Sequence, residues 1–388
     1  MRDQKLERLL LATYVVAAIV VSIQRGVFSF PNDYAIFRAS YLNLVSGQDL
    51  YVIRLSQAHD YFKYSPTFAL LFAPFAVLPF VVGLFLWNAL NATSLFFAFQ
   101  MLYRDGRAPL ALALVALPTL RSMQSAQSNS LVAALIIVAF VCFERGWIWR
   151  GAIAVGLGAV IKIFPLAALS FALPRRERLK AFSISVLVIA VLVALPLVVV
   201  PPSELIAQYR SWSTLESREA TLLGASLMAV LHDAGLELPA WPVQSAAVIT
   251  VLGVLAARWN QWKDRQFRLQ FLGFVLVFCV LFNHRAERQA AVIAVSGMAI
   301  WFLASAPVWW RVLVLAVVFA LVSVVGADVV PGTIKAALPA HARFPIPLTI
   351  LWLVMLTDLL SSSSRRGELS EADLLDSRPG DVIPELGG

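Results

Sequence analysis

Long apolar runs separated by clusters of Lys and Arg dominate this sequence. The runs cover residues 9–28, 66–103, 181–200, 242–257, 268–283, 289–305, 311–326 and 345–360. One helical crossing of a bilayer needs about 20 apolar residues. Charged residues make up 14% of the chain, against about 25% in soluble domains. The pattern excludes an ordinary soluble protein and predicts an all-α, polytopic membrane protein.

The basic clusters predict the topology, because loops rich in Lys and Arg face the cytoplasm. The clusters are Arg2, Lys5 and Arg8; Arg104 and Arg107; Arg145 and Arg150; Arg175, Arg176, Arg178 and Lys180; Arg258, Lys263, Arg265 and Arg268; Arg311; and Arg365 with Arg366. Segments 29–65, 121–129, 201–240, 283–288 and 327–344 then lie outside, and both termini lie inside. The first run lacks a small-residue cleavage site, so we expect it to be the first span.

Several apolar pieces are too short for a straight crossing. They are 108–120, 130–143 and 151–173, and we expect the last to form two half-length helices that meet near Lys162 and Pro165. Pro74 and Pro79 divide the 66–103 run into one full span and a short piece. Short helices at bilayer depth are tolerated where they line a buried, wet cavity. We therefore expect about ten to twelve membrane helices around a cavity, in a domain of residues 1–360. The polar remainder, 361–388, is expected to be a disordered cytoplasmic tail.

Several cations oppose this topology by lying at the outer ends of spans. They are Arg38, Lys63, Arg121, Arg285 and Arg288. Such a ring suits a phosphate or pyrophosphate headgroup of a lipid. Alternatively, the side chains extend to lipid headgroups or pair with Glu216, Glu219 and Glu287.

Lys162 stands in the middle of an apolar stretch, where an ionisable residue indicates a functional site. The alternative is a lysine that reaches the outer surface from the tip of the hairpin. The preceding Gly-Leu-Gly-Ala-Val-Ile lacks the adjacent Gly-Lys-Ser/Thr of a nucleotide-binding loop. Gly156 and Gly158 instead favour close helix packing.

Asp33 directly follows the first span and precedes an amphipathic stretch, 34–45, which suits a helix at the outer interface. Two roles are open for its side chain. It is either the N-cap of that helix or the carboxylate that takes a proton from an acceptor hydroxyl. Gln127 and Asn129 are similarly open, since each could contact sugar hydroxyls or cap the helix that follows.

The motifs Asp33-Tyr-Ala-Ile-Phe, Gly47-Gln-Asp-Leu-Tyr51 and Phe62-Lys-Tyr-Ser-Pro66 resemble glycosyltransferase family 87. So do the proline-punctuated 68–79, Gln127-Ser-Asn129, and Gly151 through Lys162-Ile-Phe-Pro165. The resemblance extends over about residues 10–300. This family belongs to the GT-C group of polyprenyl-phosphate-sugar-dependent membrane enzymes, which includes mannosyltransferases. The segment 282–289, Phe-Asn-His-Arg-Ala-Glu-Arg-Gln, differs from the Ser-Pro-x-Ser-x-x-His type pattern of many members.

The resemblance implies a GT-C-like fold with interfacial helices in the first outer loop and a catalytic acid there, which maps onto Asp33. It implies a hexosyl, mannose-like donor linked to polyprenyl phosphate and a lipid or glycan acceptor. As a hypothesis that fits the residues, the acceptor hydroxyl attacks the anomeric carbon and inverts it. We expect the donor phosphate to meet Lys63, Lys162, Arg285, Arg288, Arg121 and Arg38. We expect Tyr34, Tyr64, Gln127, Asn129, His284 and Glu287 to contact the sugar or acceptor. Lipid-linked sugar chemistry and the inward N-terminus suggest a bacterial plasma membrane, with the site on its outer face.

No cofactor or metal is expected, because the four histidines are scattered and lack a His-x-x-x-His pair. A transporter or flippase of a lipid-linked or anionic substrate is the main alternative. It would favour inverted repeats and acidic ion sites within spans, and the sequence has no evident repeat. A non-enzymatic scaffold would leave Lys162 and the short helices unexplained. Nucleic-acid binding is not supported, since the net charge of +8 is spread over many loops.

Overall fold

The computed structural model describes residues 4–325 and 330–361. Every regular element in these ranges is a helix, which confirms the all-α prediction. The first part contains α1 (Gln4–Val27), α2 (Asn32–Val45), α3 (Pro66–Leu71), α4 (Ala73–Ala76), α5 (Phe80–Leu102), α6 (Ala108–Gln124), α7 (Asn129–Glu144), α8 (Ile148–Ile161) and the 3₁₀ helix η1 (Phe164–Phe171). The middle contains α9 (Arg178–Ala194), η2 (Leu195–Val198), α10 (Pro202–Glu219), α11 (Leu227–Asp233), α12 (Ala240–Ala257) and η3 (Trp259–Lys263). The last part contains α13 (Arg265–Leu281), η4 (Arg288–Ala290), α14 (Ala291–Leu303), α15 (Trp309–Phe319), the π-helix η5 (Ala320–Val324), α16 (Gly332–Ala337), α17 (Ala340–Arg343) and α18 (Pro345–Ser361).

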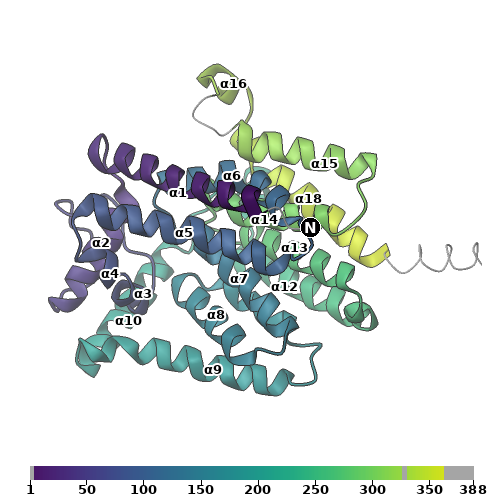
Figure 1. The fold of residues 1–388 in the computed structure, drawn as a ribbon. Helices are drawn as coiled ribbons and strands as arrows, with labels where there is room; N and C mark the ends of the chain where they lie inside the picture. Colours follow the sequence, from purple (N-terminus) through teal and green to yellow (C-terminus); the bar gives the residue numbers. More distant parts are fainter. Residues whose placement is uncertain (1–3, 326–329, 362–388) are drawn as a thin grey trace, which may run out of the picture.

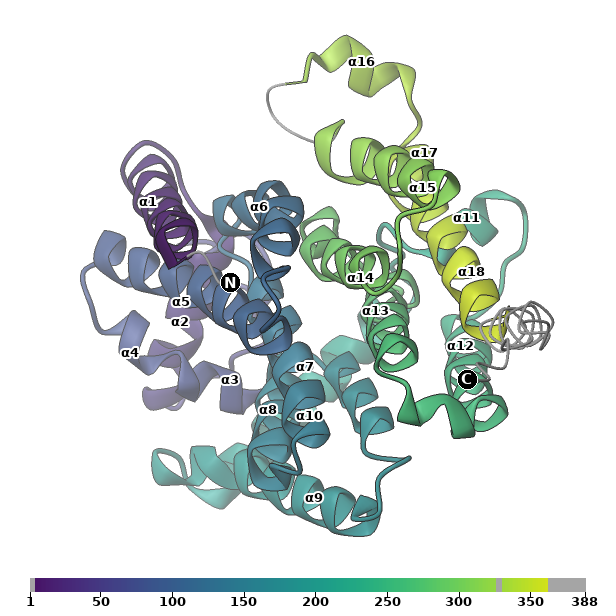
Figure 2. The ribbon, with the colours of Figure 1, turned by 45° about the vertical axis from the view of Figure 1, so that its right-hand side comes forward.

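The helices pack in a chain of neighbours around a shared apolar core. Helix α1 packs on α5, α5 on α7, α7 on α8, and α8 on α9, while α13 packs on α14 and α18. Figure 2 shows α1, α5 and α6 on the left of the molecule and α13, α14, α15 and α18 on the right. Helix α7 is mostly buried, including Ile136, Ile137 and Phe140. The centre of the bundle is thus apolar all round, as expected for helices surrounded by other helices.

By length and apolar composition, four helices of the described chain can cross a membrane. They are Gln4–Val27, Phe80–Leu102, Arg178–Val198 and Ala240–Ala257; shorter apolar helices cover Asn129–Glu144, Ile148–Ile161, Arg288–Leu303, Trp309–Val324 and Pro345–Ser361. The chain is therefore a polytopic membrane protein, and the count of ten to twelve membrane helices stays a prediction. Apart from Ser361, the predicted cytoplasmic tail lies outside the described residues.

The predicted breaks at Pro79 and near Lys162 are confirmed, whereas Pro74 lies inside α4 and the break before that helix is at Phe72. The 66–103 run divides into α3, α4 and the full-length α5, which begins directly after Pro79. The 151–173 stretch divides at Lys162, where α8 ends and an extended backbone (φ −144°, ψ 143°) leads into η1. Side chains satisfy the exposed backbone at these breaks, since Ser65 Oγ donates to the Val160 carbonyl at 2.6 Å. Broken helices need such partners at bilayer depth, where water cannot supply them.

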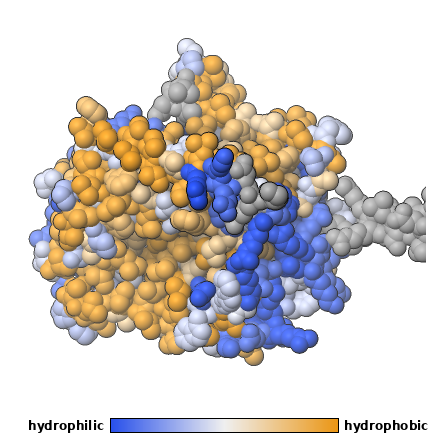
Figure 3. Space-filling model, in the orientation of Figure 1, coloured by the Kyte–Doolittle hydropathy of each residue, from blue (hydrophilic) through white to orange (hydrophobic). Residues whose placement is uncertain are grey.

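The basic clusters assigned to one side of the membrane lie together at one end of the bundle. Arg145 donates to the Met101 carbonyl at 2.8 Å, so the 104–107 and 145–150 clusters are neighbours. Arg175 and Arg268, from two further clusters, both pair with Glu144. Figure 3 shows hydrophilic side chains gathered at the lower right of this face of the molecule and hydrophobic ones over most of the rest of the same face.

The loops assigned to the other side also meet one another. The Gly224 amide donates to the His284 carbonyl at 2.7 Å, and the Leu50 amide donates to Gln208 Oε1 at 3.0 Å. Ser211 on α10 also donates to Asp49 at 2.8 Å. In Figure 1, α2, α3, α4 and α10 accordingly lie at the left end, away from the N-terminus.

The helix predicted after the first span is α2, but Asp33 does not cap it. The N-cap is Pro31, and Asp33 lies inside the first turn of the helix. The alternative role of Asp33 as a capping residue is therefore wrong. The capping alternative for Gln127 and Asn129 is wrong too, because Ser128 is the N-cap of α7 and no side chain caps this helix.

Helices α13 and α14 approach each other closely at two glycines. A Cβ atom on Gly273 would lie 2.6 Å from the Gly297 carbonyl oxygen, and one on Gly297 would lie 2.5 Å from that of Gly273. Small residues of this kind let membrane helices bring their backbones together.

We predict that Gly273→Ala and Gly297→Ala each destabilise the protein by about 1–3 kcal/mol, because the added methyl group forces the two backbones apart. Thermal unfolding of the detergent-purified protein measures the effect. Gly253→Ala on α12 is the control, since nothing lies within 4 Å of the added methyl group. Equal midpoints for all three variants would contradict the proposed close packing.

Candidate functional site

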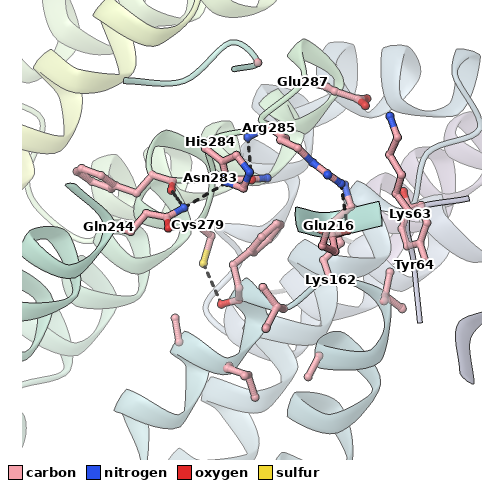
Figure 4. Close-up of a pocket in the computed structure, with 18 of the residues that line it drawn as sticks. Lys63, Tyr64, Lys162, Glu216, Gln244, Cys279, Asn283, His284, Arg285 and Glu287 are labelled. Atoms are coloured by element: carbon pink, nitrogen blue, oxygen red, sulfur yellow. Dashed lines mark hydrogen bonds and ion pairs between the residues drawn. The ribbon is translucent and has the colours of Figure 1, made fainter. Parts of the chain in front are cut away.

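A cavity of about 1280 Å³ opens among the elements of the loop end and continues into the bundle. Its polar part is lined by Asp33, Asp60, Lys63, Tyr64, Gln127, Lys162, Glu216, Glu219, His284, Arg285 and Glu287. Its apolar part is lined by residues of η1, α9, α12 and α13, among them Phe164, Leu169, Phe182, Val251 and Phe278. Figure 4 shows Lys63, Tyr64 and Lys162 on one side of the cavity and His284, Asn283 and Gln244 on the other.

One amide group joins the two carboxylates of this cavity. Gln127 Nε2 donates to Asp33 Oδ2 at 2.8 Å and to Glu287 Oε2 at 3.0 Å. The Tyr64 hydroxyl donates to Gln127 Oε1 at 3.3 Å. Asp33 comes from α2, Gln127 from the turn between α6 and α7, and Glu287 from the loop after α13. Three distant segments of the chain therefore meet at one side chain.

The surroundings of Asp33 make it more basic than an ordinary aspartate. Burial, followed by the negative charge of Glu287, raises the pKa of Asp33 to about 6, although Gln127 and Lys162 oppose the change. Asp33 lies in α2, outside the membrane-spanning helices. A carboxylate with a pKa near neutrality is well suited to take a proton in a reaction.

The ammonium group of Lys162 lies in the same cavity and has a neutral hydrogen-bond partner. Lys162 Nζ donates to Asn129 Oδ1 at 2.7 Å and lies 5.9 Å from the centre of the Tyr64 ring. The end of α8 and the start of η1 hold this side chain at the break in the helix. Lys162 is therefore placed where the polar and apolar parts of the cavity meet, and not at the outer surface.

The other two cations that line the cavity are paired with carboxylates. Arg285 contacts Glu219 at 2.9 Å and Glu216 at 3.2 Å, and Figure 4 shows the second of these contacts. Lys63 contacts Asp60 at 3.0 Å and Glu219 at 3.5 Å. The alternative of ion pairing with Glu216 and Glu219 thus describes these two residues.

The remaining candidates divide between the cavity and its surroundings. His284 lines the cavity, and burial followed by the charge of Arg285 lowers its pKa, which favours the neutral imidazole. Tyr34, Asn129, Arg38, Arg121 and Arg288 lie outside the lining. Tyr34 is fully buried and donates to the Phe75 carbonyl, while Arg38 donates to the Ala76 carbonyl, both at 3.0 Å. Arg121 lies 3.5 Å from the Val322 carbonyl, and Arg288 begins η4.

Sequence reasoning missed several residues of this site. Gln244 on α12 donates to the Phe282 carbonyl at 3.1 Å and lies 3.4 Å from His284 Nδ1, so it supports the 283–288 loop. Glu216 and Glu219, considered only as pairing partners, line the cavity from α10. Their spacing of three residues on an amphipathic helix was the available signal, since it places both on one face.

No group of three or more His, Cys, Asp or Glu side chains is arranged to hold a metal ion in residues 4–325 and 330–361.

The family prediction is confirmed by comparison with known proteins. The model of glycosyltransferase family 87 matches residues 62–283, more than half of the chain. Among solved structures, the chain is similar to the crystal structure of ArnT from Cupriavidus metallidurans bound to undecaprenyl phosphate. The sequence identity is 14% and the TM-score is 0.40, and the match covers 97% of this chain and 81% of that chain. No curated protein matches. The match over residues 62–283 shows that this chain belongs to glycosyltransferase family 87 and is a membrane glycosyltransferase.

Proposed function

We propose that the protein transfers a hexose, mannose-like in class, from a polyprenyl-phosphate-linked donor to a hydroxyl group of a lipid or glycan acceptor. The observation that carries this proposal is the shared cavity of Asp33 and Lys162, which continues from a polar mouth into an apolar interior. A base, a cation and an apolar channel are the parts that transfer from a lipid phosphate requires.

The apolar part of the cavity supports a lipid-linked donor. Val248 and Leu252 on α12 line the cavity and are also 45% and 44% exposed at the protein surface. On α9, Val186, Leu187 and Val191 are exposed apolar side chains as well. A polyprenyl chain could therefore pass from the bilayer into the cavity beside α12, with its phosphate at the polar mouth.

Lys162 is the cation that we propose for the donor phosphate. Its hydrogen-bond partner is the neutral Asn129 amide, so a phosphate can approach it without displacing a carboxylate. Lys63 and Arg285 are already engaged with Asp60, Glu216 and Glu219, and we assign them a supporting role. The remaining predicted cations do not line the cavity, so any contact that they make with the donor would be outside it; they are Arg38, Arg121 and Arg288.

In the proposed reaction, Asp33 takes the proton of an acceptor hydroxyl while that oxygen attacks the anomeric carbon. The bond between the anomeric carbon and the phosphate oxygen breaks, and the configuration inverts. The electron pair of that bond leaves with the lipid phosphate, and Lys162 stabilises the negative charge that develops there. Glu287, Tyr64 and His284 line the same space and are proposed contacts of the sugar or acceptor.

The same proposal places the enzyme in a bacterial plasma membrane. Both termini would be cytoplasmic, and the cavity mouth would face the outer side. The gathering of the basic clusters at the end of the bundle opposite the cavity mouth supports this orientation.

We predict that Asp33→Asn lowers transfer by about 10²–10⁴-fold while the protein remains folded, because the amide cannot accept the hydroxyl proton. In the wild type, kcat/KM should rise with pH and level off above about pH 6, because the base works only when ionised and the surroundings of Asp33 raise its pKa to about 6. Incubation with radiolabelled polyprenyl-phosphate sugars and a membrane lipid extract measures product formation.

The control for Asp33 is Asp49→Asn in the same loop, which accepts a hydrogen bond from Ser211 and does not line the cavity. Wild-type turnover by Asp33→Asn would remove Asp33 from the mechanism. Passage of the labelled donor across a vesicle membrane with no new product would instead favour the flippase alternative.

We predict that Lys162→Met lowers kcat/KM for the donor by about 10²-fold or more, since the developing phosphate charge loses its nearest cation. Methionine is an unbranched side chain one atom shorter than lysine, so this variant removes the charge and the bond to Asn129 and keeps most of the side-chain volume. Arg288→Met is the matched control, because Arg288 belongs to the same group of predicted cations but lies outside the cavity lining. Equal losses in the two variants would contradict a specific role for Lys162.

A further inference from the structure

The short turn that carries Gln127 and Asn129 gives the base and the cation of the cavity separate neutral partners. Gln127 donates to Asp33 and Glu287 through Nε2, while two residues later Asn129 accepts from Lys162 through Oδ1. One amide therefore presents its donor side to the carboxylates and the other presents its acceptor side to the ammonium group. We call residues 126–129 the amide turn.

The surrounding structure holds the amide turn in a single conformation. Ala126 adopts a left-handed backbone (φ +52°), which is unfavourable for a residue other than glycine. Its carbonyl accepts from Trp87 Nε1 at 2.7 Å, and one helical turn later on α5 Asn91 Oδ1 accepts from the Leu131 amide at 3.1 Å. Backbone strain persists only where the neighbouring structure determines it, and it is concentrated at functional sites.

Without the amide turn, we would expect the side chains of Asp33 and Lys162 to form a direct ion pair. They line one cavity, and opposite charges attract strongly in a low-dielectric interior. A direct ion pair would make Asp33 a weaker base and would neutralise the cation needed by a phosphate. Neutral amide partners satisfy both groups and leave their charges available.

We propose that Gln127 and Asn129 are positioning residues with separate tasks: Asn129 holds the phosphate-binding Lys162 away from the general base Asp33, and Gln127 gives Asp33 a neutral hydrogen-bond donor in place of that cation. This inference rests on the proposed function for the roles of Asp33 and Lys162. It replaces the expectation that the two amides contact the sugar: Asn129 is fully buried, and the Gln127 amide is occupied by side chains of the protein.

The test measures the titration of Asp33 without any substrate. Carbodiimide-driven coupling of an amine to protonated carboxyl groups, followed by mass spectrometry of the Asp33 peptide, gives a labelling midpoint as the pH is varied in the purified full chain. The charged and titratable groups that act on Asp33 are Asp60, Tyr64, Lys162 and Glu287, and the same cavity is also lined by Lys63, Glu216, Glu219, His284 and Arg285. All are retained in the variants.

The two halves of the amide turn should shift the midpoint in opposite directions. Gln127→Leu removes a donor to the carboxylate but leaves Lys162 bonded to Asn129, so it should raise the midpoint by about one pH unit. Asn129→Leu removes the acceptor of Lys162, which can then bond Asp33, and should lower the midpoint by about the same amount. Asn129→Asp keeps the acceptor, so its midpoint should stay at or above the wild-type value.

Gln208→Leu is the matched control for Gln127→Leu. Gln208 is 3% exposed and Gln127 5%, and both use the two ends of their amide groups, but Gln208 bonds only to the backbone of Gln48 and Leu50. We expect Gln208→Leu to leave the Asp33 midpoint unchanged.

A fall of the midpoint in both leucine variants would indicate local unfolding towards the ordinary aspartate value of about 4 and would overturn the proposal, as would unchanged midpoints. If Gln127→Leu does not fold, the comparison of Asn129→Leu with Asn129→Asp decides the question by itself. If the two leucine variants shift the Asp33 midpoint in opposite directions but the protein has no transferase activity, only the proposed function is refuted and the role of the amide turn stands. Unchanged midpoints in an active enzyme would refute the role of the amide turn alone.

Discussion

The site depends on one hydrogen-bonded bridge, in which the Gln127 amide joins the carboxylates of Asp33 and Glu287. Two carboxylates that face the same cavity repel each other, and burial increases the cost of their charges. A shared donor reduces this cost without supplying a positive charge. The aspartate therefore keeps a raised pKa of about 6, which a direct cationic partner would lower.

The broken helices explain how a membrane bundle can contain such a polar centre. Helix α8 ends at Lys162 and η1 begins at Phe164, so a lysine and an extended backbone lie at the inner end of the polar mouth. Backbone groups freed by the breaks need partners, and Ser65 and Thr67 provide them by donating to the Val160 and Leu192 carbonyls. The motif that opens α3 thus stabilises the ends of two other helices while it brings Tyr64 to the cavity.

Charge in the cavity is divided into two groups with different roles. Lys63 and Arg285 form ion pairs with Asp60, Glu216 and Glu219, and these contacts join the first loop, α10 and the loop after α13. Asp33, Glu287 and Lys162 instead bond to neutral amides. Paired charges of the first kind organise the mouth of the cavity. Charges of the second kind are the ones that we propose to meet the substrate.

Hydropathy and proline positions predicted the helical class, the divided 66–103 and 151–173 runs, and the gathering of basic clusters at one end. These properties are local, since a span depends on its own apolar residues and a break on its own proline or lysine. The partners of the site residues depend on segments far apart in the chain: Gln127 lies 94 positions from Asp33 and 160 from Glu287. Sequence patterns identified Asp33, Lys162, Gln127 and Glu287 as candidates. Only the tertiary structure decided that Asp33 accepts a hydrogen bond from Gln127 instead of capping α2. It also decided which predicted cations lie outside the cavity lining, namely Arg38, Arg121 and Arg288. The physical reason is that helix packing, and not local sequence, determines which side chains line the same cavity.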